Sequence, residues 1–190
     1  MDAVSPAVRH LTREELEAGL PHIEASPKDR GRLEAIVIRP SPNERESLSA
    51  CEISAERGVH GDNWALGCWK TTEDGRPHPD VQVCIMNARV VQLVAQSKDR
   101  WALAGDNLFV DLDLTSDNLP PGQRLAIGET VIEITAEPHN GCKKFAERYG
   151  RDAVLFVNSA AGKQLHLRGI YAKVVKAGTI SVGDPLTKID

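Results

Sequence analysis

The sequence predicts a mainly β fold with a few short helices, in which the strands close into a barrel. Apolar and β-branched residues alternate over many short segments, and glycine or proline turns separate most of these segments. The helical patterns are few and do not alternate regularly with the strands, which argues against a doubly wound sheet. A closed barrel is one way for many short strands to avoid exposed edges.

The first half of the chain starts with a helix and then changes to strands. Thr12 and Glu15 form a capping-box pattern that begins a short helix through about Ala18, and we expect Gly19 and Pro21 to stop it. The later segments are predicted from their periodicity and turn residues. They are a polar connector at 22–31, a strand at 33–39, a short strand and a long loop within 47–79, a strand at 81–86 and a helix at 88–98.

The second half is dominated by short strands. Gly128-Glu129 has the pattern of a tight hairpin turn between two of them. The predicted strands cover residues 107–114, 123–127, 131–136, 169–176, 180–182 and 186–189, and two short helices cover 143–149 and 152–158. We therefore divide the chain into an N-terminal helix and connector, residues 1–30, and a barrel domain, residues 31–190.

Composition limits the classes of function. The 190 residues suffice for one well-filled core, and the net charge of −4 argues against a general nucleic-acid binder. No apolar run is long enough to span a membrane, and residues 1–10 lack the pattern of a secretory signal. The four cysteines are widely spread, without disulfide or zinc-finger spacing, so we expect reduced thiols and a cytoplasmic location.

Cys142 is the most informative residue. It follows a strand and a turn containing Pro138, and it opens a predicted helix, so the positive end of the helix dipole and the next two lysines favour its thiolate. The thiolate is the form that attacks electrophiles and binds soft metals. The alternative is a small buried apolar residue, as most unpaired cysteines are. Lys143-Lys144 and Arg148 are local basic spots that could hold a small anion.

Other polar residues form two further patterns. The tripeptide Gly-Asp-Asn occurs at Gly61-Asp62-Asn63 and at Gly105-Asp106-Asn107, and His60 adjoins the first copy. Each copy is either a ligand-binding turn or an ordinary turn that joins two strands. His139 lies three residues before Cys142, so it could serve as the base of a Cys-His pair. Trp64 and Trp69 either cover the barrel mouth, pack in the core or offer a stacking surface.

Together these segments resemble the MOSC domain, the module named after the C-terminal part of molybdenum cofactor sulfurases. The resemblance extends from about residue 31 to residue 186, and it depends on the order of the pieces rather than on any one of them. The pieces are LEAIVIRP at 33–40, Gly58 to Asp62, Gly105 to Leu108, QRLAIG at 123–128, Cys142 after a proline turn, GIYAKVVK at 169–176 and Gly183-Asp184-Pro185.

The resemblance implies a β-barrel like the small barrel inserted in pyruvate kinase. It also implies that Cys142 is a sulfur carrier or a ligand of molybdenum held on a pterin dithiolene. Soft thiolate suits both roles. Members occur as stand-alone proteins, as sulfurase tails and in reductases of N-hydroxylated compounds. Pyridoxal phosphate belongs to the separate desulfurase domain of the sulfurases, and we do not expect this chain to bind it alone.

Two departures from the family pattern affect what is carried over. His139-Asn140-Gly141 stands where many relatives have a second proline next to the thiol. We also expect neither the additional N-terminal barrel nor the partner domains of the sulfurase and reductase branches. We therefore expect a stand-alone member, the branch in which the reaction is least settled.

The residues assigned to the site follow from this resemblance. His60, Asp62, Asn63, Asp106 and Asn107 are expected to line the barrel mouth and to hydrogen-bond a ligand. Lys143 and Arg168 are expected to neutralise a phosphate on a pterin or a similar anion, although Arg168 has the alternative of a solvated charge at the start of a strand.

Three functions remain open from the sequence. The first is sulfur carriage or molybdenum cofactor binding at Cys142, assisted by a sulfur-donor or redox partner. The second is a non-catalytic sulfur- or ligand-binding module that serves a partner enzyme. The third is a hydrolase or transferase that uses Cys142 with His139 as base.

Overall fold

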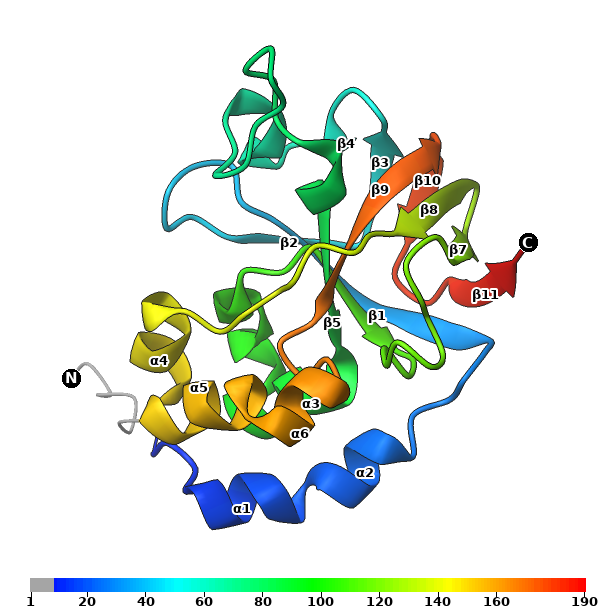
Figure 1. The fold of residues 1–190 in the computed structure, drawn as a ribbon. Coiled ribbons are helices and arrows are strands. Elements are labelled where there is room, and N and C mark those ends of the chain that lie inside the picture. The colour runs from blue at the N-terminus through cyan, green and yellow to red at the C-terminus, as the bar shows by residue number, and fades with distance from the viewer. Residues whose placement is uncertain (1–8) are drawn as a thin grey trace, which may run out of the picture.

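The computed structural model describes residues 9–190, and in this part of the chain seven strands close into a ring (Figure 1). The closed barrel predicted from the sequence is therefore confirmed. The ring closes where Gly31 pairs with Leu186, and β5 and β6 form its one parallel pair. In ring order the strands are β11 (Pro185–Ile189), β7 (Arg124–Ile127), β8 (Thr130–Ile134), β9 (Ile170–Lys176), β5 (Val83–Asn87), β6 (Leu108–Asp111) and β1 (Gly31–Ile38).

The barrel forms because its strands turn branched aliphatic side chains inward. In β8 the alternate residues Thr130, Ile132 and Ile134 are buried, as a period of two requires. The same pattern on the other strands fills the barrel with side chains such as Leu33, Ile85, Leu108, Leu125 and Leu186. Strand β5 is buried throughout, because its other face also packs against protein.

A second core lies between the barrel and the helices, which gather on one side of the molecule (Figure 1). Its aromatic side chains include Trp101, Phe109, Phe145, Tyr149 and Phe156. The elements that cover this side are α1 (Arg13–Ala18), α2 (Leu20–Glu24), α3 (Ala88–Ala95), η3 (Lys98–Ala104), α4 (Lys143–Tyr149), α5 (Arg151–Asn158) and α6 (Ala160–Gln164).

The remaining elements lie outside the ring. Strand β2 (Glu46–Leu48) pairs with β1, and β10 (Gly178–Ser181), β3 (Ala50–Ser54) and β4 (Gly58–Val59) form a small separate sheet. The long connection before β5 contains the two short turns η1 (Asn63–Leu66) and η2 (Pro79–Val81). In Figure 1 this connection projects from the barrel on the side away from the helices.

Several local predictions are confirmed and others are wrong. The Thr12 capping box, the hairpin at Gly128-Glu129 and the helices after Ala88 and Cys142 form as predicted. Helix α1 ends at Ala18 with Gly19 as its C-cap, as predicted. The second helix, α2, was not predicted; Pro21 lies in its first turn, where the missing N–H costs nothing. Helices η3 and α6 were not predicted. The segment 47–79 also contains more strand than the single one expected.

The N-terminal segment packs on the helical side. Leu16 of α1 and Ile23 of α2 are buried in the second core, together with residues of α3 and α5. Most of residues 1–10, in which we found no secretory signal, lie outside the described residues. Each helix within 9–190 is too short, or not apolar enough, to cross a bilayer.

Candidate functional site

Cys142 is exposed at the start of α4, and its backbone is held firmly. The amide of Gly141 donates to Asn158 Oδ1 at 2.8 Å, and Asn158 Nδ2 donates back to the Gly141 carbonyl at 3.0 Å. A Cβ at position 141 would lie 2.9 Å from methyl groups of Val154 and Val157, so a larger residue would require these side chains to shift. The Cys142 side chain forms no capping hydrogen bond within residues 9–190. The fold therefore fixes the position of this thiol and leaves it open to reagents.

The two Gly-Asp-Asn turns meet inside the protein, although Asp62 and Asn107 are 45 positions apart in the sequence. Asn107 Nδ2 donates to Asp62 Oδ1 at 3.1 Å. Arg39 joins both turns, because it forms an ion pair with Asp62 at 2.7 Å and donates to the Gly105 carbonyl at 3.1 Å. Asp62 and Asn107 are buried, so their polar atoms are used within the protein. The structure thus brings these predicted residues together as one buried network.

Asp106 and Arg168 form a second buried ion pair. Arg168 Nη1 lies 2.9 and 2.8 Å from the two Asp106 carboxylate oxygens, and Arg168 Nη2 donates to the Ala104 carbonyl. Arg168 is 6% exposed, so the alternative of a solvated charge is wrong. Burial alone would lower the pKa of Arg168, but the Asp106 carboxylate outweighs burial and raises it. The guanidinium also lies 5.1 Å from the ring of Phe145 in α4.

His139 is buried rather than free to move towards the thiol. Its ring stacks on Tyr171 with centroids 4.3 Å apart, and its Nδ1 lies 3.7 Å from Asp106 Oδ1. Burial, with Arg168 and Arg39 next in importance, holds the pKa of His139 well below its usual value. No hydrogen bond joins His139 to Cys142 in the described part of the chain. The Cys-His pair therefore gains no support from this geometry.

Basic side chains gather around Gly105. A Cβ on Gly105 would lie 3.5 Å from Arg45 Nη2 and 3.7 Å from Arg148 Nη1. Gly105 has φ +84°, which suits glycine and leaves this space open. The buried Nε of Arg45 has no hydrogen-bond partner among the described residues. Burial, followed by the charges of Arg148 and Arg39, lowers the pKa of Arg45. Arg39 is paired with Asp62, but Arg45 and Arg148 have no ion-pair partner within residues 9–190, so the cluster of Arg39, Arg45 and Arg148 carries more positive than negative charge.

Sequence reasoning found only part of this cluster. It named Arg148 as a local basic spot, but it did not identify Arg39 or Arg45. Nothing in the local pattern distinguishes these two arginines from surface charges, because the groups that they meet lie far away in the sequence. Arg39 is the last residue of the predicted strand 33–39 and follows directly after the observed β1, and this position at a strand end was the one available signal.

The other predicted residues lie at the edge of this network or outside it. His60 is half-buried, with Nδ1 3.3 Å from Glu52 and Nε2 3.1 Å from the Ser54 hydroxyl. Asn63 begins η1 and donates its amide to the Arg39 carbonyl. Lys143 extends into solvent, 3.9 Å from Glu147. Within residues 9–190 no three His, Cys, Asp or Glu side chains are grouped to hold a metal ion.

The two tryptophans have different environments. Trp64 is buried in the connection before β5 and donates its Nε1–H to the His78 carbonyl. Trp69 is 69% exposed. Trp64 therefore packs in the protein interior, and only Trp69 presents a free ring face.

Comparison with known proteins identifies the fold. A family model described as the MOSC domain matches residues 56–187. The YuaD protein of Bacillus subtilis matches with a TM-score of 0.58 and 17% identity, covering 83% of this chain and 94% of its own. YiiM of Geobacillus stearothermophilus gives 0.58 and 15%, with 84% and 75% covered, and YiiM of Escherichia coli gives 0.53 and 21%, with 84% and 70% covered. No curated protein sequence matches the chain.

Proposed function

Because this chain belongs to the MOSC domain family, we propose that Cys142 is a sulfur-handling thiol that carries sulfane sulfur or ligates the molybdenum of a pterin cofactor. The reaction served is the sulfuration of a molybdoenzyme or the reduction of N-hydroxylated compounds. One observation carries the proposal. Of the four cysteines, all of which lie in the described part of the chain, Cys142 is the exposed one. A nucleophilic or metal-binding thiol must be reachable.

Sulfur carriage requires a single exchange step. The Cys142 thiolate attacks the terminal sulfur of a persulfide donor, R–S–SH, so that an S–S bond forms on Cys142 as the donor S–S bond breaks. The donor leaves as the thiolate R–S⁻, and Cys142 then holds the persulfide. A second thiol, such as one on an acceptor enzyme, can then attack the outer sulfur of this persulfide, and Cys142 leaves as the thiolate. The two hydrogen bonds between Asn158 and the Gly141 backbone, called here the Asn158–Gly141 clamp, fix the chain next to Cys142. The exposed sulfur can then be approached by a donor protein.

The residues around Gly105 fit the phosphate of a pterin cofactor. Arg45 and Arg148 face the space beside Gly105, and the buried Arg45 Nε has no acceptor in residues 9–190. A phosphate would supply both the acceptor and the missing negative charge. Arg148 lies on α4 six residues after Cys142, which is about 9 Å along the helix axis. When bound, the molybdenum centre would supply the two-electron chemistry.

The buried predicted residues act in this proposal by positioning others. Asp62 and Asn107 accept hydrogen bonds from Arg39, and Asp106 accepts from Arg168. They thereby position the two arginines that donate to the Ala104 and Gly105 carbonyls. Lys143, His60 and Asn63 remain candidates for direct contact, since all three are at least partly exposed. A cytoplasmic location with a sulfur-donor or redox partner is part of the same proposal, supported by the four free thiols.

Mass spectrometry after incubation with a persulfide donor tests the sulfur-carrier role. We expect an adduct of one sulfur atom on Cys142, which is lost in Cys142→Ser and kept in the matched variant Cys68→Ser. An adduct distributed over Cys51, Cys68 and Cys84 would exclude selective sulfur carriage.

Metal and pterin analysis tests the cofactor role. Protein purified from molybdate-fed cells should contain molybdenum, and Cys142→Ser should lose it. Arg45→Gln should reduce the content, whereas Arg57→Gln, at an exposed site, should not. Sulfur transfer to Cys142 without bound molybdenum, and without turnover, would identify a non-catalytic carrier that serves a partner enzyme.

A further inference from the structure

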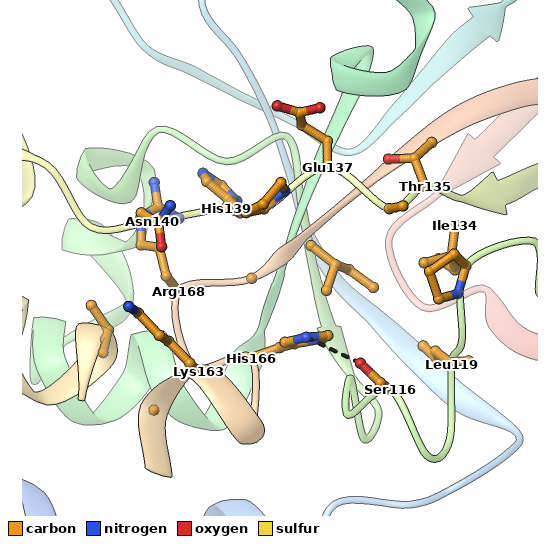
Figure 2. Close-up of a pocket in the computed structure, with 17 residues that line it drawn as sticks. Ser116, Leu119, Ile134, Thr135, Glu137, His139, Asn140, Lys163, His166 and Arg168 are labelled. Atoms are coloured by element: carbon orange, nitrogen blue, oxygen red, sulfur yellow. Dashed lines mark hydrogen bonds between the residues drawn. The ribbon is translucent and has the colours of Figure 1, made fainter. Parts of the chain in front are cut away.

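A cleft of about 390 Å³ lies beside the segment that leads to Cys142. Most of its wall comes from residues within 116–121, 134–140 and 162–170, and Val157 of α5 adds to it. Figure 2 shows Lys163 and His166 on one side of the cleft, with Glu137 and His139 across from them. Cys142 and Arg45 are not among the lining residues, so this cleft is separate from the thiol and from the cation cluster at Gly105. Its volume lies within the range of small-molecule sites.

The polar groups of the cleft leave one positive charge uncompensated. Glu137 lies in the wall but forms an ion pair with Lys70, and Arg168 is paired with Asp106. Lys163 has no ion-pair partner among the residues that the structure describes. The cleft therefore has a single ammonium group to offer to a ligand.

His166 and Arg168 set the hydrogen-bonding character of the site. His166 has a left-handed backbone (φ +49°), and its ring spans from the Leu114 carbonyl at 2.7 Å to the Ser116 hydroxyl at 3.3 Å. It thus ties two walls together (Figure 2). Arg168 is 6% exposed, and its Nε donates to no acceptor in the described chain. A buried donor without an acceptor is costly, so a ligand that supplies one would be stabilised.

The rest of the lining is apolar. Leu119, Ile134, Val157 and Ile170 contribute aliphatic surface that can cover the body of a small organic molecule. A ligand with an apolar body and one negative charge matches this surface and the Lys163 ammonium. A phosphate dianion matches it less well, because it would need a second unpaired cation.

We infer that this cleft binds a small organic carboxylate, whose charge is met by Lys163, whose oxygen accepts from Arg168 Nε, and whose apolar body lies on Ile134 and Ile170. The bound molecule would contact Asn140 and Val157, which flank the Asn158–Gly141 clamp that holds Cys142. The inference goes beyond the proposed chemistry at the thiol and does not depend on it.

A titration followed by ¹H–¹⁵N NMR, with benzoate as the probe and benzamide as its neutral counterpart, tests the inference. Benzoate should shift the amides of Ser116, Asn140 and Lys163 with saturation in the millimolar range, as suits so small a ligand. Benzamide should bind about tenfold more weakly, and Lys163→Gln should weaken benzoate by a similar factor. The matched variant Lys144→Gln should leave benzoate binding unchanged.

Three results would overturn the inference. They are benzoate shifts that miss the cleft residues, equal binding of benzoate and benzamide, and unchanged benzoate affinity in Lys163→Gln. The titration is repeated on Cys142→Ser, which should bind benzoate normally. If Cys142→Ser loses sulfur transfer but still binds benzoate, the inference is independent of the proposed function. If sulfur transfer is retained but benzoate does not bind in the cleft, only the carboxylate inference is refuted.

Discussion

Replacing Asp106 by asparagine should destabilise the protein strongly, although the change is nearly isosteric. Asp106 is fully buried and accepts two hydrogen bonds from Arg168 Nη1. Asp106→Asn removes the negative charge and leaves the buried Arg168 guanidinium, with Arg39 nearby, uncompensated. Breaking a buried pair in this way costs about 3–5 kcal/mol of unfolding free energy. In a protein of this size, that corresponds to a fall in Tm of about 6–20 °C.

Urea unfolding followed by the fluorescence of the three tryptophans measures this loss. Arg168→Met should cost a similar amount, because it leaves Asp106 without its cation. The double variant Asp106→Asn/Arg168→Met should be more stable than the sum of the single changes predicts, since it leaves no unpaired charge. Asp74→Asn provides the surface control, because Asp74 pairs with Arg76 in solvent, and its midpoint should not move. An unchanged midpoint in Asp106→Asn, or strict additivity in the double variant, would refute this reasoning.

Three further changes probe other parts of the fold. Below about pH 6.5 the unfolded chain takes up a proton on His139, whereas the folded state keeps this ring neutral. The free energy of unfolding should therefore decrease as the pH is lowered below that value, by at most about 1.4 kcal/mol per pH unit. In urea titrations His139→Phe should flatten that slope and the exposed His22→Gln should not; equal slopes in wild type and His139→Phe would contradict the assignment. Thr12→Ala removes the capping box of α1 and should cost about 1 kcal/mol by the same method, and no loss would contradict the role of the cap. Gly169→Ala places a Cβ 2.2 Å from the Ile85 carbonyl oxygen at φ +110°, so it should lower Tm markedly, and a wild-type Tm would show that this turn can relax.

The barrel could be predicted from the sequence because its signals are local. Each strand shows its own alternation, and turns such as Gly128-Glu129 mark where it ends. Helix α2 was missed because Pro21 resembles a stop signal, although proline is compatible with a first helical turn. Helix α6 was missed because its five residues are too few to show a period.

The site was harder to predict because its contacts are long-range. The sequence identified both Gly-Asp-Asn turns and Cys142 but could not show that Arg39 would join the turns, since Arg39 and Gly105 are distant in the chain. Arg45 lies in a polar loop and looks like any solvated charge until the fold places it beside Gly105. The burial of His139 likewise depends on its stacking against Tyr171 from β9.

The proposed function requires Cys142 to be the reactive thiol of this protein, and the alkylation rate of each cysteine tests this requirement most directly. Burial raises the pKa of both Cys51 and Cys84 from about 9 to about 11, which makes their thiolate fraction at neutral pH about 100-fold smaller. Treatment of the native protein with limiting iodoacetamide at pH 7.5, followed by peptide mass spectrometry, gives the four rates. The more basic thiolates of Cys51 and Cys84 are also better nucleophiles, which offsets part of this factor, so we expect the exposed Cys142 to react at least about 10-fold faster than these two buried thiols. A rate at Cys142 no higher than at Cys84 would contradict the proposed sulfur chemistry.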